Sequence, residues 1–426
     1  MNPIGKSGTR HMSSRRKFIK LAALTPLLAS TSVFSAATKF TGKFVVTVQA
    51  HGGWDVTCFC DPKENQRGEL VITKWSTNDE AQSTGNIKYA PFASNEKFFK
   101  KHASKMLVIN GVDSQTNSHS IGRTVNWSGR TALGYPSLTA LYSAVYAPIL
   151  PLTYLTFGGF NRTESLVRST QVGGRLTGIR ELISPAFGNE GAMAELWDAI
   201  KTVQANDAQS IVESSIFAAG NRRTREAYST SLKRMEPLAE FAETLPIDGW
   251  EPRSKDGNLR QQAQFAVAAF KGGVSVAADL YQSGFDTHTL NDSQQTTFLN
   301  KLTDGIDYLW DAAEEAGIAD RLVVIVGSDF SRTPYYNFLD GKDHWPVGSY
   351  IIMEKGKGYT NRYVDGSDEG QNAARIDPET LRPSGFGTKI LTSHVHDALR
   401  EYLGLANSAA ADVFPLRNTE RFNFFS

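Results

Sequence analysis

Six short runs of apolar residues follow the first forty positions of the chain, and each is typical of a strand buried on both faces. Between the fourth and fifth runs, apolar side chains recur at every third or fourth position from Ser293 to Ala316, and Gly317 follows. This spacing predicts a long helix that ends at the glycine. A strand, a long helix and a further strand predict a parallel crossover. The six runs are 44–48, 106–109, 152–157, 274–280, 322–326 and 350–352.

The middle of the chain has a different composition. Residues 186–270 are rich in Ala, Glu, Arg and Gln, with a loop broken by Pro and Gly at 245–257. This composition predicts a mostly helical insertion packed on the sheet. We therefore expect an α/β fold, with a large, mostly parallel sheet between helices and one helical insertion.

The N-terminal segment has the pattern of a twin-arginine signal peptide. Arg15 and Arg16 precede an apolar stretch, Leu21–Phe34, which is too short for a typical membrane span, and the small residues Ser35–Ala37 follow. An ordinary secretory signal and an uncleaved anchor are the alternatives. We expect cleavage after Ala37.

This signal defines the expected organisation. Residues 1–37 form the signal, and residues 38–426 form a single domain that the twin-arginine (Tat) machinery exports, already folded, to the periplasm or beyond. No stable membrane span is expected after cleavage. Export in the folded state suits proteins that take up a metal or cofactor beforehand, so the route itself favours a metal site.

Charge and cysteine content narrow the class of protein. The chain has 45 basic and 44 acidic residues with no long block of one sign, which argues against binding to nucleic acid or to an anionic membrane. Aromatic and hydrophobic contents of 11% and 40% are those of a packed globular protein. Cys58 and Cys60 are too close for an unstrained disulfide, and we interpret them as small strand or loop side chains. A local disulfide or a metal role is the alternative.

Polar motifs follow three of the expected strands. They are His51–Asp55, Gly284–His288 and Gly327–Thr333. Because the carboxyl ends of parallel strands open on one crevice, acids from these three loops are expected to converge there. Converging carboxylates repel one another unless a cation lies among them.

Histidines complete a candidate metal site. Asp286 and His288 are two residues apart, which on an extended segment places both side chains on one face. His344 lies in a further loop, Gly341–Trp345. Acids and histidines without cysteine suit zinc, manganese or a similar divalent ion. The ordinary alternatives are helix caps and turns for the acids and hydrogen-bonded loop positions for the histidines. The candidate ligands are Asp55, Asp286, His288, Asp329 and His344.

Together, four motifs resemble, in order and spacing, the Tat-exported bacterial family called domain of unknown function 1501. That family resembles a branch of the alkaline phosphatase and sulfatase superfamily, whose fold is a large mixed sheet between helices with one or two metals at strand ends. The resemblance implies hydrolysis of a phosphate or sulfate ester. The motifs are His51–Gly53, Gly284–His288, Ser328–Thr333 and Asp343–Pro346.

The resemblance also implies a role for each candidate ligand. Asp55 would be the ligand after the first strand, and Asp286 and His288 would share one ion. Asp329 would be the acid after the later strand, and His344 would complete the shell of the first ion. One departure is Phe330, which stands where superfamily members often have a second histidine or asparagine ligand, so one of two metal sites would be lost or rebuilt.

A second departure concerns the nucleophile. Sulfatases carry a nucleophile followed four residues later by arginine, and here His119 and Arg123 have that spacing. His119 would either attack phosphorus or bind a metal that activates water, and Ser118 and Ser120 are weaker candidates for the nucleophile. Arg123 and Arg332 would hold the free oxygens of the ester, with ordinary ion pairs as the alternative.

The sequence thus leaves two hypotheses open. The first is a secreted metal-dependent hydrolase of a phosphate or sulfate ester, on a small molecule or a polymer, with one or two divalent ions, zinc or manganese. The alternative is a non-catalytic secreted protein that serves binding or assembly on the same scaffold. His394 and His396 lie in an expected amphipathic helix, 393–403, and are interpreted as packing or surface residues.

Overall fold

The computed structural model describes residues 40–426, except for 159, 173–194, 197–198, 201, 204–205, 207–234, 246–257 and 419. The expected signal peptide lies outside these residues, and so does most of the expected helical insertion. Both therefore stay predictions. Within the described part of the chain, no helix has the length and apolar character that crossing a membrane requires.

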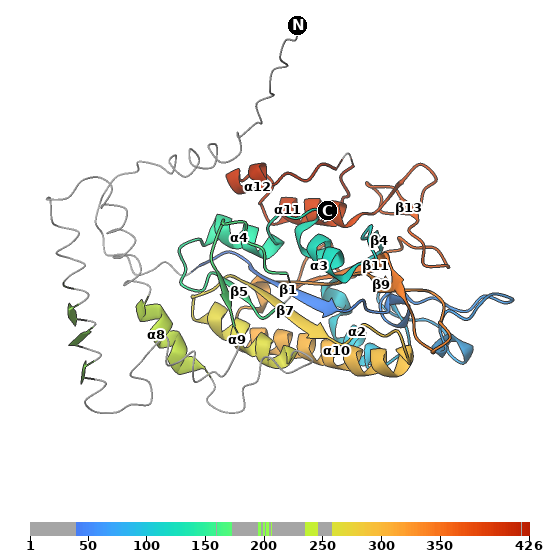
Figure 1. The fold of residues 1–426 in the computed structure, drawn as a ribbon, viewed down its shortest axis with the longest axis horizontal. Coiled ribbons are helices and arrows are strands. Elements are labelled where there is room, and N and C mark those ends of the chain that lie inside the picture. Colours follow the sequence, from blue (N-terminus) through green and yellow to red (C-terminus); the bar gives the residue numbers. More distant parts are fainter. Residues whose placement is uncertain are drawn as a thin grey trace, which may run out of the picture. The chain divides into compact units, whose positions relative to one another are not determined.

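Eight strands form one sheet in the order β12-β4-β11-β8-β1-β7-β5-β6 (Figure 1). β11 is antiparallel to both its neighbours, while all the other neighbouring strands are parallel. The predicted mostly parallel sheet is confirmed, and each of the six apolar runs overlaps a strand. The strands are β1 (Phe44–His51), β4 (Met106–Asp113), β5 (Tyr154–Thr156), β6 (Ser169–Gln171), β7 (Ala277–Ser283), β8 (Leu322–Ser328), β11 (Val347–Glu354) and β12 (Arg362–Val364).

Helices cover both faces of this sheet, and the alternation of side chains along β1 explains how (Figure 1). Val46, Val48 and Ala50 belong to an apolar cluster with α2 (Asn95–His102), α9 (Leu259–Lys271) and α10 (Asn291–Glu315). Val45 belongs to a second cluster on the opposite face. That cluster includes residues of α3 (His119–Ser128), α4 (Leu138–Tyr146) and α11 (Thr392–Tyr402).

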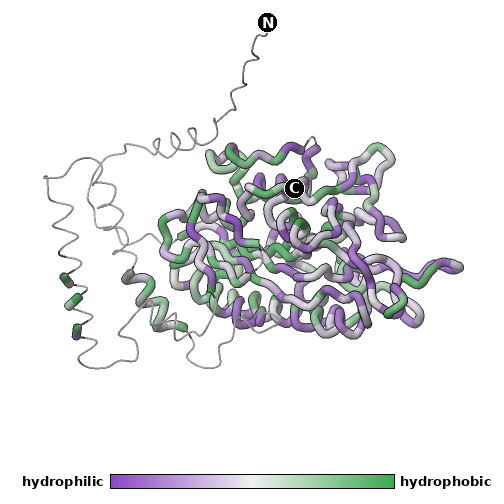
Figure 2. The backbone as a smooth tube through the Cα atoms, in the orientation of Figure 1, coloured by the Kyte–Doolittle hydropathy of each residue, from purple (hydrophilic) through white to green (hydrophobic). Residues whose placement is uncertain are grey.

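Apolar and polar positions alternate along the outer helices in Figure 2, as expected for helices that bury one face and expose the other.

The remaining elements are short and lie outside the main sheet. They are α8 (Met235–Thr244), α12 (Ala409–Val413), β2 (Gln82–Thr84), β3 (Ile87–Tyr89), β9 (Ser331–Arg332), β10 (His344–Trp345), β13 (Arg375–Ile376) and β14 (Thr388–Lys389).

The long helix predicted from Ser293 is confirmed as α10. It ends where predicted, because Gly317 takes a left-handed conformation with φ of 70° directly after the C-cap. It begins two residues earlier, at Asn291, whose buried side chain bonds Thr287 and Asp55. Tertiary hydrogen bonds therefore define this end of the helix, and a local pattern in the sequence does not show them.

The two late histidines and the two cysteines have structural roles. His394 and His396 are buried in α11, where His394 Nδ1 accepts from the Leu391 amide and His396 Nε2 bonds the carbonyl of Asn126. This agrees with the packing role predicted for them. Cys58 and Cys60 are both buried and form no disulfide.

A buried carboxyl group on β7 makes the stability of the domain depend on pH. Asp279 accepts hydrogen bonds from Thr47 Oγ1 at 2.7 Å, from Thr139 Oγ1 at 2.6 Å and from the Tyr154 hydroxyl. Among the described residues, no basic side chain contacts it. Burial therefore outweighs the three hydroxyl donors and raises the pKa of Asp279 from 3.8 to about 6.

We expect Asp279→Asn to remove a pH dependence of folding stability. Between pH 4 and 6 the folded state binds a proton at Asp279 that the unfolded state has lost, so the free energy of unfolding of the wild type falls as pH rises, by roughly 3 kcal/mol in all. Denaturant titrations at several pH values should show this fall in the wild type and a flatter profile in the variant. Parallel profiles would contradict this role.

Candidate metal centre

Loops at the carboxyl ends of the parallel strands bring one acid and three histidines together. His119 is the first residue of α3, which follows β4. Asp286 and His288 follow β7, and His344 lies in β10, just before β11. Because β11 runs against its neighbours, its first residues lie at the edge where the other strands end. The antiparallel strand is therefore what places His344 beside the other three side chains.

One ring nitrogen of each of the three histidines lies close to the same carboxylate oxygen. Asp286 Oδ1 lies 3.4 Å from His119 Nε2, 3.2 Å from His288 Nε2 and 3.4 Å from His344 Nε2. The ligating atoms of His119, Asp286 and His344 are all within 4.8 Å of one another. His288 Nε2 lies 3.0 Å from His344 Nε2. Three of the five predicted ligands are thus together, and His119 joins them in place of the other two.

The second nitrogen of each ring has its own partner. His119 Nδ1 lies 2.8 Å from Asp329 Oδ2, His288 Nδ1 lies 2.7 Å from Asp343 Oδ1, and His344 Nδ1 lies 2.7 Å from the carbonyl oxygen of Asn117. A carbonyl oxygen only accepts, so His344 Nδ1 must donate. In a neutral ring this leaves the lone pair on Nε2. Metal-binding histidines are commonly oriented by such a bond from the other ring nitrogen.

This arrangement fits a cation and is unfavourable without one. Lone pairs on the Nε2 atoms would face a carboxylate oxygen at the distances given above, which is a contact between acceptors. Burial lowers the pKa of His344, which disfavours relief by protonation. His119 Nε2 is buried and has no hydrogen-bond partner among the described residues. Imidazoles with one carboxylate are a donor set that suits zinc.

Arg332 holds the central carboxylate in place. Its guanidinium is fully buried and donates to Asp286 Oδ1 at 2.8 Å, as well as to the carbonyl oxygens of Gly52, Gly53 and Lys342. Burial alone would raise the pKa of Asp286, but the hydrogen bond and charge of Arg332 together lower it. Arg332, expected to hold the free oxygens of a substrate, instead has its donors engaged by the protein.

Asp55 differs from the expectation for a metal ligand. Its carboxylate is fully buried and pairs with Lys342 Nζ at 2.8 Å, and the amide of Asn291 donates to it at 2.9 Å. It also caps a short 3-10 helix, Val56–Cys58, by accepting from the Thr57 amide. Burial would raise the pKa of Asp55, but Lys342 and the hydrogen bonds lower it. This is the helix-capping role left open by the sequence, combined with a buried ion pair.

Asp329 and Phe330 also have roles other than those expected from superfamily ligands. One oxygen of Asp329 bonds His119 Nδ1 and the other accepts from Gln49, so Asp329 orients the ring of His119 and does not face the cluster directly. The ring of Phe330 is buried, and its centroid lies 4.8 Å from that of His119 and 4.4 Å from that of His344. An apolar wall thus lies beside both histidines, at the position where the resemblance implied a second ligand.

Two further residues of the four motifs lie at this site, although neither was predicted from the sequence to be a site residue. Asp343 orients His288, and its place directly before His344 was the available signal. His51 ends β1, and its pKa is lowered by burial, while the charges of Asp329, Arg123, His119 and Asp286 also act on it. The carbonyl oxygen of His51 accepts from the amide of Phe285 at 3.2 Å, so His51 lies next to the loop that holds Asp286.

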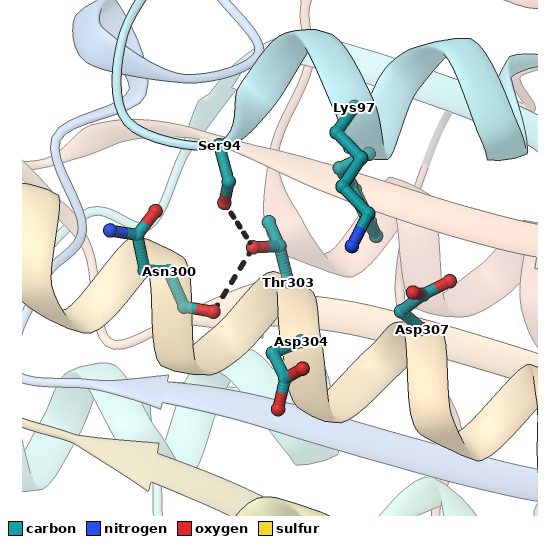
Figure 3. Close-up of a pocket in the computed structure, with 7 residues that line it drawn as sticks. Ser94, Lys97, Asn300, Thr303, Asp304 and Asp307 are labelled. Atoms are coloured by element: carbon teal, nitrogen blue, oxygen red, sulfur yellow. Dashed lines mark hydrogen bonds between the residues drawn. The ribbon is translucent and has the colours of Figure 1, made fainter.

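A separate pocket lies between α2 and α10, on the face of the sheet opposite α3 (Figure 3). The hydroxyls of Ser94 and Thr303 bond each other across it at 2.8 Å, and Lys97, Asp304 and Asp307 also line it. None of its lining residues belongs to the cluster around Asp286, so this pocket is not part of the centre.

Residues 192–357 match the family model described as "Protein of unknown function (DUF1501)". The resemblance expected from the motifs is confirmed over this segment, which contains Asp286, His288, Asp329 and His344. No curated protein sequence matches the chain.

Solved structures with a similar fold are distant in sequence. A glycosaminoglycan-metabolism protein of Bacteroides thetaiotaomicron is 10% identical, with coverage of 90% of this chain and 77% of that chain and a TM-score of 0.44. The phosphonate monoester hydrolase of Agrobacterium radiobacter is 11% identical, with coverage of 85% and 74% and a TM-score of 0.36. The alkaline phosphatase of the Antarctic bacterium TAB5 is 10% identical, with coverage of 76% and 95% and a TM-score of 0.34.

Metal binding should depend on the convergent residues in a graded way. Asp286→Ala and His344→Ala remove donors and should lower zinc affinity at least about 100-fold, while Asp343→Asn, which acts on a ligand's orientation, should lower it about 10–100-fold. Asp340→Asn is the matched control, since this exposed acid of the same loop pairs with Lys74. Competition titrations with a zinc chelator measure all four. Equal affinity in Asp286→Ala and wild type would remove Asp286 from the site.

Asp55→Ala should act on stability and not on metal binding. It leaves Lys342 buried without its charge partner, which we expect to cost about 3–5 kcal/mol of unfolding free energy. Adding Lys342→Met should restore part of that loss, because no unpaired charge is left. Denaturant titration gives the stability, and zinc titration of the folded protein gives the affinity. A loss of zinc affinity as large as that of Asp286→Ala would return Asp55 to the ligand set.

Proposed function

We propose that this chain is a secreted hydrolase of phosphate or sulfate esters that works with a divalent ion, zinc in the first instance, held by His119, His288, His344 and Asp286. The observation that carries the proposal is the convergence of three Nε2 atoms on one oxygen of Asp286, each ring being oriented by a hydrogen bond from its other nitrogen. When bound, such an ion supplies Lewis acidity toward an ester oxygen or water.

The start of α3 offers binding groups for the ester. Among the described residues, no side chain caps this helix end, so the amides of its first turn have no intrahelical or side-chain partner there. Free amides and the positive end of the helix dipole favour an anion. His119 is the first residue of this helix, so an anion there would lie beside the proposed ligands.

Arg123 adds a charge one helical turn further on. It is half-buried, and its Nε donates to the carbonyl oxygen of His119 at 3.2 Å. Its charge acts on His51. In the proposed reaction the guanidinium stabilises the negative oxygens of the ester, which a forked donor does well.

Water is the proposed nucleophile. His119 stands in the place of the nucleophile of sulfatases, but its Nε2 faces Asp286 and its Nδ1 bonds Asp329. In this proposal the Nε2 lone pair of His119 binds the ion and Nδ1 bonds Asp329, which leaves neither nitrogen for attack on phosphorus or sulfur. The hydroxyls of Ser118 and Ser120 bond each other at 3.2 Å. A hydroxyl is not a general base, so this contact activates neither serine as a nucleophile.

A non-catalytic binding or assembly protein is the second candidate. The observation in its favour is Phe330, whose ring fills the position of a further ligand and leaves a donor set for a single ion. Under this hypothesis the ion would stabilise the loops that follow β7 and β8, and the protein would bind its partner without turnover.

A panel of aryl phosphate, phosphodiester and aryl sulfate esters tests the proposal. With added zinc or manganese, and with bound metal verified, the wild type should hydrolyse at least one class of ester, and Asp286→Ala should lose at least about 100-fold in rate. His119→Ala should lose both rate and zinc affinity. Excess zinc should restore part of the rate, because the variant lacks a metal ligand but the proposed reaction needs no covalent intermediate on His119. Asp340→Asn is the control.

The opposite results separate the candidates. Hydrolysis by Asp286→Ala at the wild-type rate would place the reaction elsewhere. A wild type that is inert on the whole panel, with its metal verified, would favour the binding or assembly protein.

A further inference from the structure

A hollow beside α3 carries two arginines that the proposed reaction does not fully use. Ser120, Arg123 and Thr124 form one side of it, and Phe160, Asn161 and Arg162 form the other. The described residues that line it include no acidic side chain. We propose that this hollow binds a second anionic group of a substrate that carries at least two, such as a multiply phosphorylated or sulfated molecule; this rests on the proposed function.

The hollow is a neighbour of the metal centre through two elements. α3 contributes His119 to the centre and Arg123, one turn later, to the hollow. Residues 160–162 follow β5, and β5 lies next to β7, whose following loop holds Asp286. A molecule bound at the centre therefore needs to extend only to the adjacent strand end to reach the hollow.

The charges of the hollow are unmatched. Arg123 donates from Nε to the carbonyl oxygen of His119, which leaves its terminal nitrogens available, and no carboxylate pairs with Arg162 among the described residues. Two guanidinium groups that face one hollow repel each other, and an anion between them removes that repulsion. Asn161 adds a neutral polar side chain to the same wall.

The wall that bears Arg162 is fixed to the rigid part of the fold. The carbonyl oxygen of Arg162 accepts from the amide of Ser137 at 2.8 Å, and Ser137 is the N-cap of α4. Phe160, two residues earlier, is buried in the apolar cluster under α4. The main chain at Arg162 is therefore fixed, although its side chain is exposed, so binding an anion there orders less of the chain than it would on a loose loop.

Binding two anions at once should raise affinity well beyond that of either alone. The ligands for the test are glucose 1,6-bisphosphate and glucose 6-phosphate, which differ by one phosphate. Calorimetric titrations at about 0.15 M salt, where distant surface charges are screened, use the zinc-loaded wild type, Arg162→Gln and Arg168→Gln. Arg168 is an exposed arginine of the same segment that does not line the hollow, so its variant is the matched control for charge.

We expect the wild type and Arg168→Gln to bind the bisphosphate at least about tenfold more tightly than the monophosphate. In Arg162→Gln this ratio should fall to near one. A wild type without the preference, or a preference that survives in Arg162→Gln, would overturn the subsite. An equal fall in both variants would indicate general surface charge and would overturn it too.

The proposed hydrolase and the subsite can fail separately. The binding ratio needs no turnover, so a chain inert on the ester panel that still shows a ratio sensitive to Arg162 would keep the subsite and lose the hydrolase. A chain that hydrolyses esters but binds the bisphosphate no more tightly than the monophosphate would keep the hydrolase and lose the subsite. If the chain hydrolyses phosphate esters, Arg162→Gln should also raise the KM of the bisphosphate more than that of the monophosphate.

Discussion

The acceptor contact between the Asp286 carboxylate and three imidazole nitrogens is the constraint on which the rest of the site depends. With neutral rings, these four groups are acceptors that repel one another, and each is held in place by a hydrogen bond to its other polar atom or, for the carboxylate, to Arg332. Asp329, Asp343 and a backbone carbonyl hold the rings, and Arg332 holds the carboxylate. The energy that keeps this arrangement comes from these hydrogen bonds around the centre, and a cation would turn the remaining repulsion into attraction.

The sequence predicted the elements and the edge of the sheet better than the individual ligands. Apolar runs located the strands, and helical spacing located α10, because burial on both faces and on one face leaves periodic signals. The sequence also predicted that Asp286, His288 and His344 lie together, since each follows or precedes a strand at the same edge. Their positions next to strands were enough for this prediction, and no knowledge of a distant contact was needed.

The differences between the predicted and the observed contacts share one cause. Asp55 pairs with Lys342, which is 287 positions away, and Asp329 turns toward His119, which is 210 positions away. Spacing along the chain gives no information about which distant charge meets a carboxylate. Arg332 is a similar case, because an arginine after a strand has the same pattern whether its donors meet carbonyl oxygens or solvent. His119, predicted in the place of a nucleophile, lies beside Asp286, but the sequence does not show the partners of its two ring nitrogens.

Three consecutive residues of one loop do three unrelated things. Lys342 neutralises Asp55 and gives its carbonyl oxygen to Arg332, Asp343 orients His288, and His344 faces Asp286 from the strand that pairs with Arg332. The length of this loop is therefore as constrained as its composition. Inserting or deleting a single residue ahead of Lys342 would put each of these side chains out of register at once, so homologous chains that keep the centre should differ here by substitution and not by length.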